Sequence, residues 1–308
     1  MSRIWVVGSG VVGRRVRRFL DDLGAIQARS RHPIGPTAEG DVAVLASGGS
    51  HADMAGLLLT RGVGVVTVGD DVDDCSDLVS LGDIAEANDV PLVIGAALSP
   101  GLSGLLVRSM LPELRMCSEI HIALHGTAGP ACARAYHRSL SGRTSMWWDG
   151  EMKTAPGGSG RELLWFPEPV GPQDCYLAEI ASPLLLHRSL PDVARISVRR
   201  SARRRDRLTA RLPMMRPPHA EGRIGALRVE VRGIDHAGRR VTIVRGVAEQ
   251  IGTASASVAA AFAESAAAGK LPSGLTLAGD PIVNDLGMLR RVTRRGIRVQ
   301  QYSGSEVD

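Results

Sequence analysis

The feature that most constrains this chain is a short apolar run near its N-terminus that leads directly into a glycine-rich turn. The run Ile4–Val7 is typical of a buried parallel strand. Residues 8–13 then read Gly-Ser-Gly-Val-Val-Gly, which fits the pattern G-x-G-x-x-G. Apolar residues recur at helical spacing from Val12 to Leu23, so a helix follows the turn. Strand, turn and helix in this order predict a dinucleotide-binding unit; a purely structural glycine turn is the alternative.

Each glycine of this turn has a physical reason to be there. Gly8 permits the tight turn, Gly10 lets the backbone approach a pyrophosphate, and Gly13 lets helix and strand pack closely. Free N–H groups at the start of the helix would face the phosphates. The predicted cofactor-binding residues of the turn are Gly8, Ser9, Gly10, Val11, Val12 and Gly13.

The residues after the second predicted strand indicate which dinucleotide binds. An NAD site places an acidic residue about 20 residues beyond the glycines, on the ribose 2′-hydroxyl. Here the strand near residues 25–28 is followed by Arg29, Ser30 and Arg31. A guanidinium matches a 2′-phosphate in charge and geometry, and a serine hydroxyl can donate to it. The segment favours NADP, with NADPH preferred over NADH; two solvated arginines on a loop are the alternative.

Strands and helices go on alternating through the first third of the chain. Strands are expected at residues 41–45, 63–68 and 91–94, and helices at 51–61 and 74–88. Ligands of an open parallel sheet bind outside the carboxyl ends of its strands. The small or polar residues at these ends that we assign to the cofactor site are Ser47, Gly48, Gly69, Asp70, Gly95 and Ala96.

No metal site or disulfide framework is expected. The acidic run Asp70–Asp77 lacks the glycine and terminal glutamate of a calcium-binding loop, and it fits helix capping and first-turn charge instead. The four cysteines are widely spaced and form no C-x-x-C pair. No apolar run is long enough to cross a bilayer, and no signal peptide is recognisable. These observations predict a cytoplasmic protein without membrane contact.

The segment Gly95–Ser103 ends a predicted strand and begins a helix with Gly-Ala-Ala-Leu-Ser-Pro-Gly-Leu-Ser. Together with the glycine turn and the Arg29–Arg31 segment, it resembles the saccharopine dehydrogenase-like NADP-binding family. The resemblance is good over residues 1–110 and looser beyond, at Phe166–Pro172 and Arg295–Val299. It implies an NAD(P)H-dependent oxidoreductase that acts on the C–N bond of an amino-acid-derived imine. With the Arg29–Arg31 segment, the predicted function is an NADP-dependent oxidoreductase acting on such an imine or an opine. A non-catalytic NADPH-binding Rossmann protein with an association domain is the alternative.

From about residue 117 the pattern changes to half-buried strands with helices among them, which indicates an α+β domain. The expected fold class is therefore α/β, with an N-terminal Rossmann parallel sheet followed by this second domain. We predict a Rossmann domain over residues 1–115 and a substrate and dimerisation domain over 116–270. Residues 271–308 should form a helix and a strand that pack back on the first domain. The sheet of the second domain is the expected surface of a homodimer.

Charge also differs between the two parts. Residues 1–110 hold nine Arg and 13 acids, whereas residues 111–308 hold 28 cations and 19 acids, which accounts for the net charge of +5. The arginine run at residues 199–207 is typical of a solvated strand edge or loop, with polyanion contact as the alternative. Because aromatic residues make up only 3% of the chain, little is available for base stacking, and no nucleic-acid partner is expected.

The reaction implied by the resemblance needs one group that handles a proton, because the hydride comes from the cofactor. His125 ends a strand before a glycine-rich turn, His137 lies in the next predicted helix, and Lys153 is one of only two lysines. These three residues are the catalytic candidates, and an ordinary structural role is the alternative for each. For the small amino-acid-like substrate, the binding candidates are Ser99, Arg134 and Tyr136.

Overall fold

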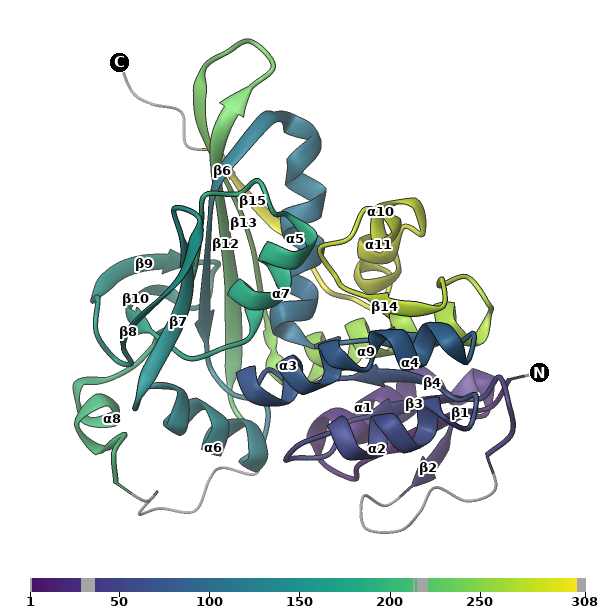
Figure 1. Cartoon of the computed structure of the whole chain (residues 1–308). Coiled ribbons are helices and arrows are strands. Elements are labelled where there is room, and N and C mark those ends of the chain that lie inside the picture. The colour runs from purple at the N-terminus through teal and green to yellow at the C-terminus, as the bar shows by residue number, and fades with distance from the viewer. Residues whose placement is uncertain (1, 29–36, 213, 215–220, 304–308) are drawn as a thin grey trace.

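Two β-sheets lie side by side, one built mainly from the N-terminal third of the chain and the other from its middle (Figure 1). The computed structural model describes residues 2–28, 37–212, 214 and 221–303. No helix among these residues is both long and apolar enough to span a membrane.

The first sheet is parallel throughout, with the strand order β14-β5-β4-β3-β1-β2. Its strands are β1 (Ile4–Val7), β2 (Ile26–Ala28), β3 (Val42–Leu45), β4 (Gly64–Thr67), β5 (Pro91–Val93) and β14 (Gly274–Thr276). β2 lies on one side of β1, and β3 and the strands after it lie on the other. The strand order therefore reverses between β1 and β3, which makes this the topological switch point. The predicted N-terminal Rossmann sheet is confirmed.

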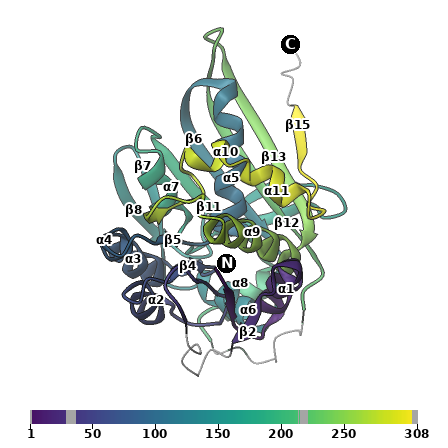
Figure 2. The same ribbon diagram turned by 90° about the vertical axis from the view of Figure 1, so that its right-hand side faces the viewer.

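Helices cover both faces of this sheet because its strands are apolar on both sides. β1, β3 and β4 are buried along their whole length. Figure 2 shows α2, α3 and α4 on one side of the sheet and α1 and α9 on the other. The bounds are α1 (Val11–Phe19), α2 (Ala52–Leu59), α3 (Val72–Ser80), α4 (Gly82–Ala87) and α9 (Ile251–Ala267). The single helix predicted at 74–88 is thus two helices that meet at Leu81.

Helix α9 joins the two halves of the molecule. It is rich in Ala and Ser, and it packs against α1 and β3 on one side and against β12 and β13 on the other. A Cβ atom on Gly252 would lie 2.6 Å from Cγ1 of Val11, so a glycine is needed for α9 to start this close to α1. One apolar core runs from the first sheet through α9 to the second sheet.

The second sheet has nine strands in the order β15-β13-β12-β6-β11-β10-β9, with the β7–β8 hairpin beside β11. Neighbours pair antiparallel except β6 and β11. The strands are β6 (Leu114–His125), β7 (Arg143–Trp148), β8 (Glu151–Pro156), β9 (Glu162–Phe166), β10 (Gly171–Leu177), β11 (Arg195–Ser201), β12 (Ile224–Asp235), β13 (Arg240–Gln250) and β15 (Gln300–Ser303). The accompanying helices are α5 (Ser103–Met110), α6 (Pro130–Ser139), α7 (Ser182–Ser189) and α8 (Arg204–Thr209). This sheet with its helices confirms the predicted second domain.

The last segment of the chain contributes to both sheets. β14 pairs with β5 and extends the first sheet, so part of the segment 271–308 packs on the first domain. The strand expected within residues 271–308 forms as β15 but pairs with β13 of the second sheet, because the long β13 offers an unpaired edge there. The helix expected in the same segment is two short helices, α10 (Ile282–Asp285) and α11 (Met288–Thr293), separated at Gly287, whose φ is +60°. The division of the chain at residues 115 and 270 stays a prediction.

Candidate functional site

The glycine turn after β1 has the close contacts that its sequence pattern predicts. A Cβ atom on Gly8, whose φ is +122°, would lie 2.5 Å from the carbonyl oxygen of Ala46. A Cβ atom on Gly13 would lie 2.0 Å from the carbonyl oxygen of Gly8, so strand and helix are in backbone contact there. A Cβ atom on Gly10 would meet nothing within 4 Å. Gly8 and Gly13 are therefore needed for close backbone packing, whereas the absence of a side chain at Gly10 leaves open the space in front of α1.

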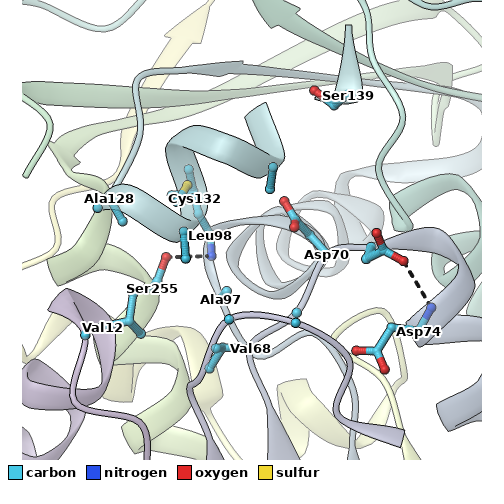
Figure 3. Close-up of a pocket in the computed structure, with 18 of the residues that line it drawn as sticks. Val12, Val68, Asp70, Asp74, Ala97, Leu98, Ala128, Cys132, Ser139 and Ser255 are labelled. Atoms are coloured by element: carbon cyan, nitrogen blue, oxygen red, sulfur yellow. Dashed lines mark hydrogen bonds between the residues drawn. The ribbon is translucent and has the colours of Figure 1, made fainter. Parts of the chain in front are cut away.

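That space belongs to a cavity of about 830 Å³ between the two sheets. The cavity lies at the carboxyl ends of β1, β3 and β4, where the switch point places a ligand site. Figure 3 shows side chains from both domains around it, including Val12, Val68 and Asp70 on one side and Ala128 and Cys132 on the other. A dinucleotide fits this cradle, because the glycines leave backbone N–H groups and open space where a pyrophosphate would lie.

Most of the predicted cofactor-binding residues line the cavity. They are Gly8, Ser9, Gly10, Val11, Val12, Ser47, Gly48, Gly69 and Asp70. Gly95 and Ala96 lie beneath its surface: a Cβ atom on Gly95 would be 2.3 Å from Cγ of Pro100, and Ala96 is fully buried. The lining is instead formed by the next residues, 97–99. The segment Arg29–Arg31 lies outside the described residues.

None of the three catalytic candidates lines the cavity. His125 ends β6, where successive side chains alternate between faces, and its neighbour Leu124 is the one that faces the cavity. Nδ1 of His125 lies 2.8 Å from Oγ of Ser201, and its ring lies 6.0 Å from that of Phe166. Burial lowers the pKa of His125, and the charge of Arg203 lowers it further.

The other two candidates lie farther out on the second domain. Nε2 of His137 donates a hydrogen bond of 2.9 Å to the carbonyl oxygen of Leu212. Lys153 stands on β8 with its side chain 46% exposed, and Nζ lies 3.2 Å from Oε1 of Glu151. The three side chains therefore make contacts within the second domain, and the titratable groups that line the cavity are other residues.

Of the substrate candidates, only Ser99 lines the cavity. Its hydroxyl lies 2.7 Å from that of Ser182, at the start of α7, and 3.0 Å from that of Ser103. Tyr136 donates its hydroxyl proton to the carbonyl oxygen of Ser201 and does not face the cavity. Arg134 is exposed on α6, and Arg138, one turn later, is the arginine of that helix that lines the cavity.

The residue that the sequence interpretation missed is Arg200. Its guanidinium lines the cavity from β11, and the side chain is only 7% exposed. Nη2 lies 3.4 Å from Oδ2 of Asp70, while Nε and Nη1 find no hydrogen-bond partner among the described residues. A signal was present: Ile196 and Val198 are buried on the same face of β11, so the period of two continues into Arg200. A buried guanidinium with free donors points to an anionic ligand.

Asp70 follows β4 and faces Arg200 across the cavity. Partial burial raises the pKa of its carboxyl group, the charge of Arg200 lowers the pKa in part, and the charge of Asp71 raises it. Burial likewise raises the pKa of the nearby Cys132 thiol, so Cys132 is a neutral thiol in the lining. Within the described part of the chain, no three His, Cys, Asp or Glu side chains are grouped to hold a metal ion.

Hydrogen bonds tie the two sides of the cavity together. The backbone N–H of Ala181 donates to the carbonyl oxygen of Asp70 at 3.0 Å. The backbone N–H of Leu98 donates to Oγ of Ser255 in α9 at 3.2 Å. With the Ser99–Ser182 contact, these bonds fix the second domain over the carboxyl ends of the first sheet.

Comparison with known proteins identifies similar structures. No protein-family model matches the sequence, and no curated protein matches it either. The fold is similar to that of saccharopine dehydrogenase (L-Glu forming) from Saccharomyces cerevisiae, with a TM-score of 0.65 and 11% identity over 98% of this chain and 100% of that chain. It is also similar to C. glutamicum DAP dehydrogenase and to an engineered D-amino acid dehydrogenase bound to NADP+. Each of these two matches has a TM-score of 0.50 and 14% identity, and it covers 90% of this chain and 93% of the other. The resemblance seen in the sequence is confirmed at the level of the fold: the chain has the saccharopine dehydrogenase-like fold, a Rossmann domain with a second sheet closing over its ligand edge.

Proposed function

We propose that the protein is an NADP-dependent oxidoreductase that acts on the C–N bond of an amino-acid-derived imine or opine. The single observation that carries this proposal is Arg200, a buried guanidinium in the same cavity as the glycine turn, with two nitrogen atoms that have no hydrogen-bond partner in the described part of the chain. A guanidinium fork matches carboxylates and phosphates, and because the glycine turn is the site for the cofactor phosphates, we assign a carboxylate of the substrate to Arg200. The three similar structures are all dehydrogenases, and one of them holds NADP+, which supports this cofactor class.

Different residues of the cavity would bind the substrate, orient it and transfer the proton in such a reaction. A bound NADPH would supply a hydride to the imine carbon, leaving NADP+, while one proton completes the new amine at nitrogen. Arg200 and Arg138 bind and orient the substrate carboxylate from the second domain. Asp70 has a raised pKa and lies beside Arg200, so it is the group best placed to hold or deliver the proton. Ser99 closes the floor of the cavity.

Preference for NADP remains a proposal from the sequence, through Arg29, Ser30 and Arg31. It predicts tighter binding of NADPH than NADH by the wild type. Arg29→Asp should remove or reverse that preference, because a carboxylate repels the 2′-phosphate and accepts from the ribose hydroxyl. Fluorescence titration with both cofactors measures the ratio of affinities. An unchanged ratio in the variant would overturn the NADP assignment.

The alternative is a cofactor-binding protein without turnover, which also has to bind NADPH. A screen of NADPH oxidation over keto acids paired with amino acids distinguishes the two functions. Oxidation with one pair, lost in Arg200→Ala but not in the exposed-arginine control Arg134→Ala, supports the enzyme. NADPH binding without oxidation of any pair supports the alternative. A homodimer through the second sheet is part of the proposal and is tested by the mass of the protein in solution.

A further inference from the structure

A buried histidine and a buried aspartate face each other under the wall of the cavity. His51 precedes α2 and is 3% exposed, and Asp74 lies in the first turn of α3 and is 5% exposed. Nδ1 of His51 lies 3.6 Å from Oδ2 of Asp74. Neither atom has a hydrogen-bond partner among the described residues, although both side chains belong to the cavity wall.

The remaining contacts of the two side chains fix how their protons are arranged. Nε2 of His51 lies 3.0 Å from the carbonyl oxygen of Ser47, and since a carbonyl can only accept, Nε2 carries a hydrogen. In the neutral ring Nδ1 is then a bare acceptor. Oδ1 of Asp74 accepts from Oγ of Ser50 at 2.7 Å and from the backbone N–H groups of His51 and Ala52 at 2.7 and 3.1 Å. The Asp74 carboxylate is therefore held in place, with its second oxygen aimed at another acceptor.

Two acceptors in contact repel each other, and one added proton would turn the contact into a hydrogen bond. Burial lowers the pKa of His51, and the charge of Asp74 and the bond to Ser47 oppose this effect. Burial therefore favours the neutral ring, which takes up its proton at a lower pH than an ordinary histidine. Gly69 packs closely on the pair, because a Cβ atom there would lie 3.3 Å from both Nδ1 and Oδ2.

The other charged groups near this pair are acidic or remote. Asp71 accepts the backbone N–H of Asp74 at the start of α3, and Asp70 precedes it at the end of β4. Cys75 on α3 stays a neutral thiol, because burial raises its pKa far above the usual range. On α2 itself, Asp53 is exposed. The cations that line the same cavity, Arg138 and Arg200, come from the second domain.

We propose that His51 is a positioning residue for the cofactor, and that one proton shared between Nδ1 of His51 and Oδ2 of Asp74 sets the pH dependence of cofactor binding. Nε2 holds the carbonyl of Ser47 in either protonation state, and the added proton on Nδ1 would also tie the ring to Asp74. The turn of residues 47–50, which lines the cavity beside the glycine turn, would then be anchored to α3 through His51. It also adds one positive charge where the cofactor phosphates would lie. This inference rests on the proposed function in so far as a dinucleotide occupies that turn.

Asp74→Asn separates this role from a merely structural one. The Asn amide oxygen can accept the same three donors as Oδ1, and its NH2 group can donate to neutral Nδ1, so the contact forms without a proton. In the wild type, the dissociation constant for NADP+ should rise by about tenfold between pH about 5 and pH about 8, with about half a proton taken up on binding at the midpoint of this change. In Asp74→Asn this part of the pH dependence should be lost, leaving only the titration of the 2′-phosphate of NADP+ itself. Calorimetry in buffers of different ionisation enthalpy measures both quantities on the full chain, and NADP+ is used because NADPH decomposes in acid.

A second variant and a matched control keep the test decisive. His51→Gln removes the titrating ring and should give the same profile as Asp74→Asn. His187 is the control, because burial lowers its pKa and its Nδ1 is buried without a partner among the described residues, yet it stacks on Trp147 outside the cavity lining. His187→Gln should retain the wild-type profile. The same pH dependence in the wild type, Asp74→Asn and His51→Gln would overturn the proposal and leave the proposed function intact.

Failure of the cofactor assignment would be recognised separately. If NADP+ binds to none of these proteins at any pH, the proposed cofactor is wrong, and NMR titration of the His51 ring still decides the proton question. The midpoint of His51 should fall by about one pH unit or more in Asp74→Asn, because the amide donor favours the neutral ring. An unchanged midpoint would show that Asp74 and His51 share no proton.

Discussion

Nη2 of Arg200 lies 3.4 Å from Oδ2 of Asp70, although the two residues are 130 positions apart in the sequence. Asp70 stands at the carboxyl end of a strand of the first sheet, and Arg200 near the end of a strand of the second. The pair therefore forms only when both domains are folded and docked. It places a cation and a carboxyl group of raised pKa together in the cavity that the glycine turn also lines.

Removal of the Arg200 guanidinium should weaken substrate binding without affecting the cofactor. A charge-assisted hydrogen bond contributes about 2 kcal/mol, so Arg200→Ala should raise KM by about 30-fold. Arg200→Lys should recover only part of this loss, because an ammonium group cannot bind a carboxylate through two parallel bonds. Steady-state kinetics gives KM, and fluorescence titration gives the NADPH affinity. A large loss of NADPH affinity in both variants would place Arg200 at the cofactor instead.

Asp70 should determine how the reductive reaction responds to pH. Because its pKa is raised, its carboxyl group stays protonated to a higher pH than an ordinary aspartate, and the acid form is the proton donor. The value of kcat/KM should therefore fall as pH rises through this raised pKa. Asp70→Asn should lose that limb of the profile and lower kcat by about 100-fold. Asp71→Asn is the matched control, and an identical loss there would assign the effect to local charge alone.

The glycine turn offers a test that separates the fold from the ligand. Gly13→Ala places a Cβ atom against the carbonyl oxygen of Gly8, so it should destabilise the protein by about 1–3 kcal/mol. Gly10→Ala meets no protein atom and should leave the melting temperature nearly unchanged, while it weakens NADPH binding by about tenfold through contact with the pyrophosphate. Thermal melting and NADPH titration of both variants give the comparison. Full NADPH affinity in Gly10→Ala would contradict the assigned cradle.

Asp41 should make the protein sensitive to acid. Burial raises its pKa, but hydrogen bonds from Ala38, from the Trp5 indole and from Arg3 outweigh this effect and lower the pKa from 3.8 to about 2. A depressed folded-state pKa gives stability that is present above the unfolded value and lost as pH falls through the folded one. About 2 kcal/mol should therefore disappear between pH about 4 and pH about 2.

Urea unfolding followed by tryptophan fluorescence measures this loss. Asp41→Asn should be less stable than the wild type at neutral pH, and the difference should shrink as pH falls to about 2, because the Asp41 carboxyl group loses its charge as pH falls through its folded-state pKa. Asp83→Asn on the exposed face of α4 is the control and should follow the wild type throughout. A constant gap between the wild type and Asp41→Asn across this range would contradict the prediction.

The first sheet could be predicted from the sequence because its signals are local. Ile4–Val7 and the glycines after it specify strand, turn and helix within about 20 residues. The chemistry of the cavity could not be predicted in this way, because it depends on which face of a strand each residue occupies. His125 and Leu124 are neighbours in the sequence, so their side chains lie on opposite faces of β6. The register of β6 places Leu124, and not His125, on the face that lines the cavity.

Arg200 shows the same limit in a different way. In the sequence it stands inside a run of arginines, which is typical of a solvated edge. In the structure Arg199 pairs with Glu162 on one face of β11, while Arg200 is buried on the other. Both arginines belong to the same basic run of the sequence. Only the alternation of buried residues, which continues from Ile196 and Val198 to Arg200, distinguishes the buried Arg200 from Arg199.

The sixth strand of the first sheet has a consequence for how the protein is made. β14 and the covering helix α9 come from beyond the second sheet's long hairpin, so a nascent chain cannot finish its dinucleotide-binding half until nearly all of it has left the ribosome. The apolar face that α9 covers stays open until then. The N-terminal third expressed alone should therefore not fold stably, because it lacks β14 and α9. The two halves of the protein should fold together in one event.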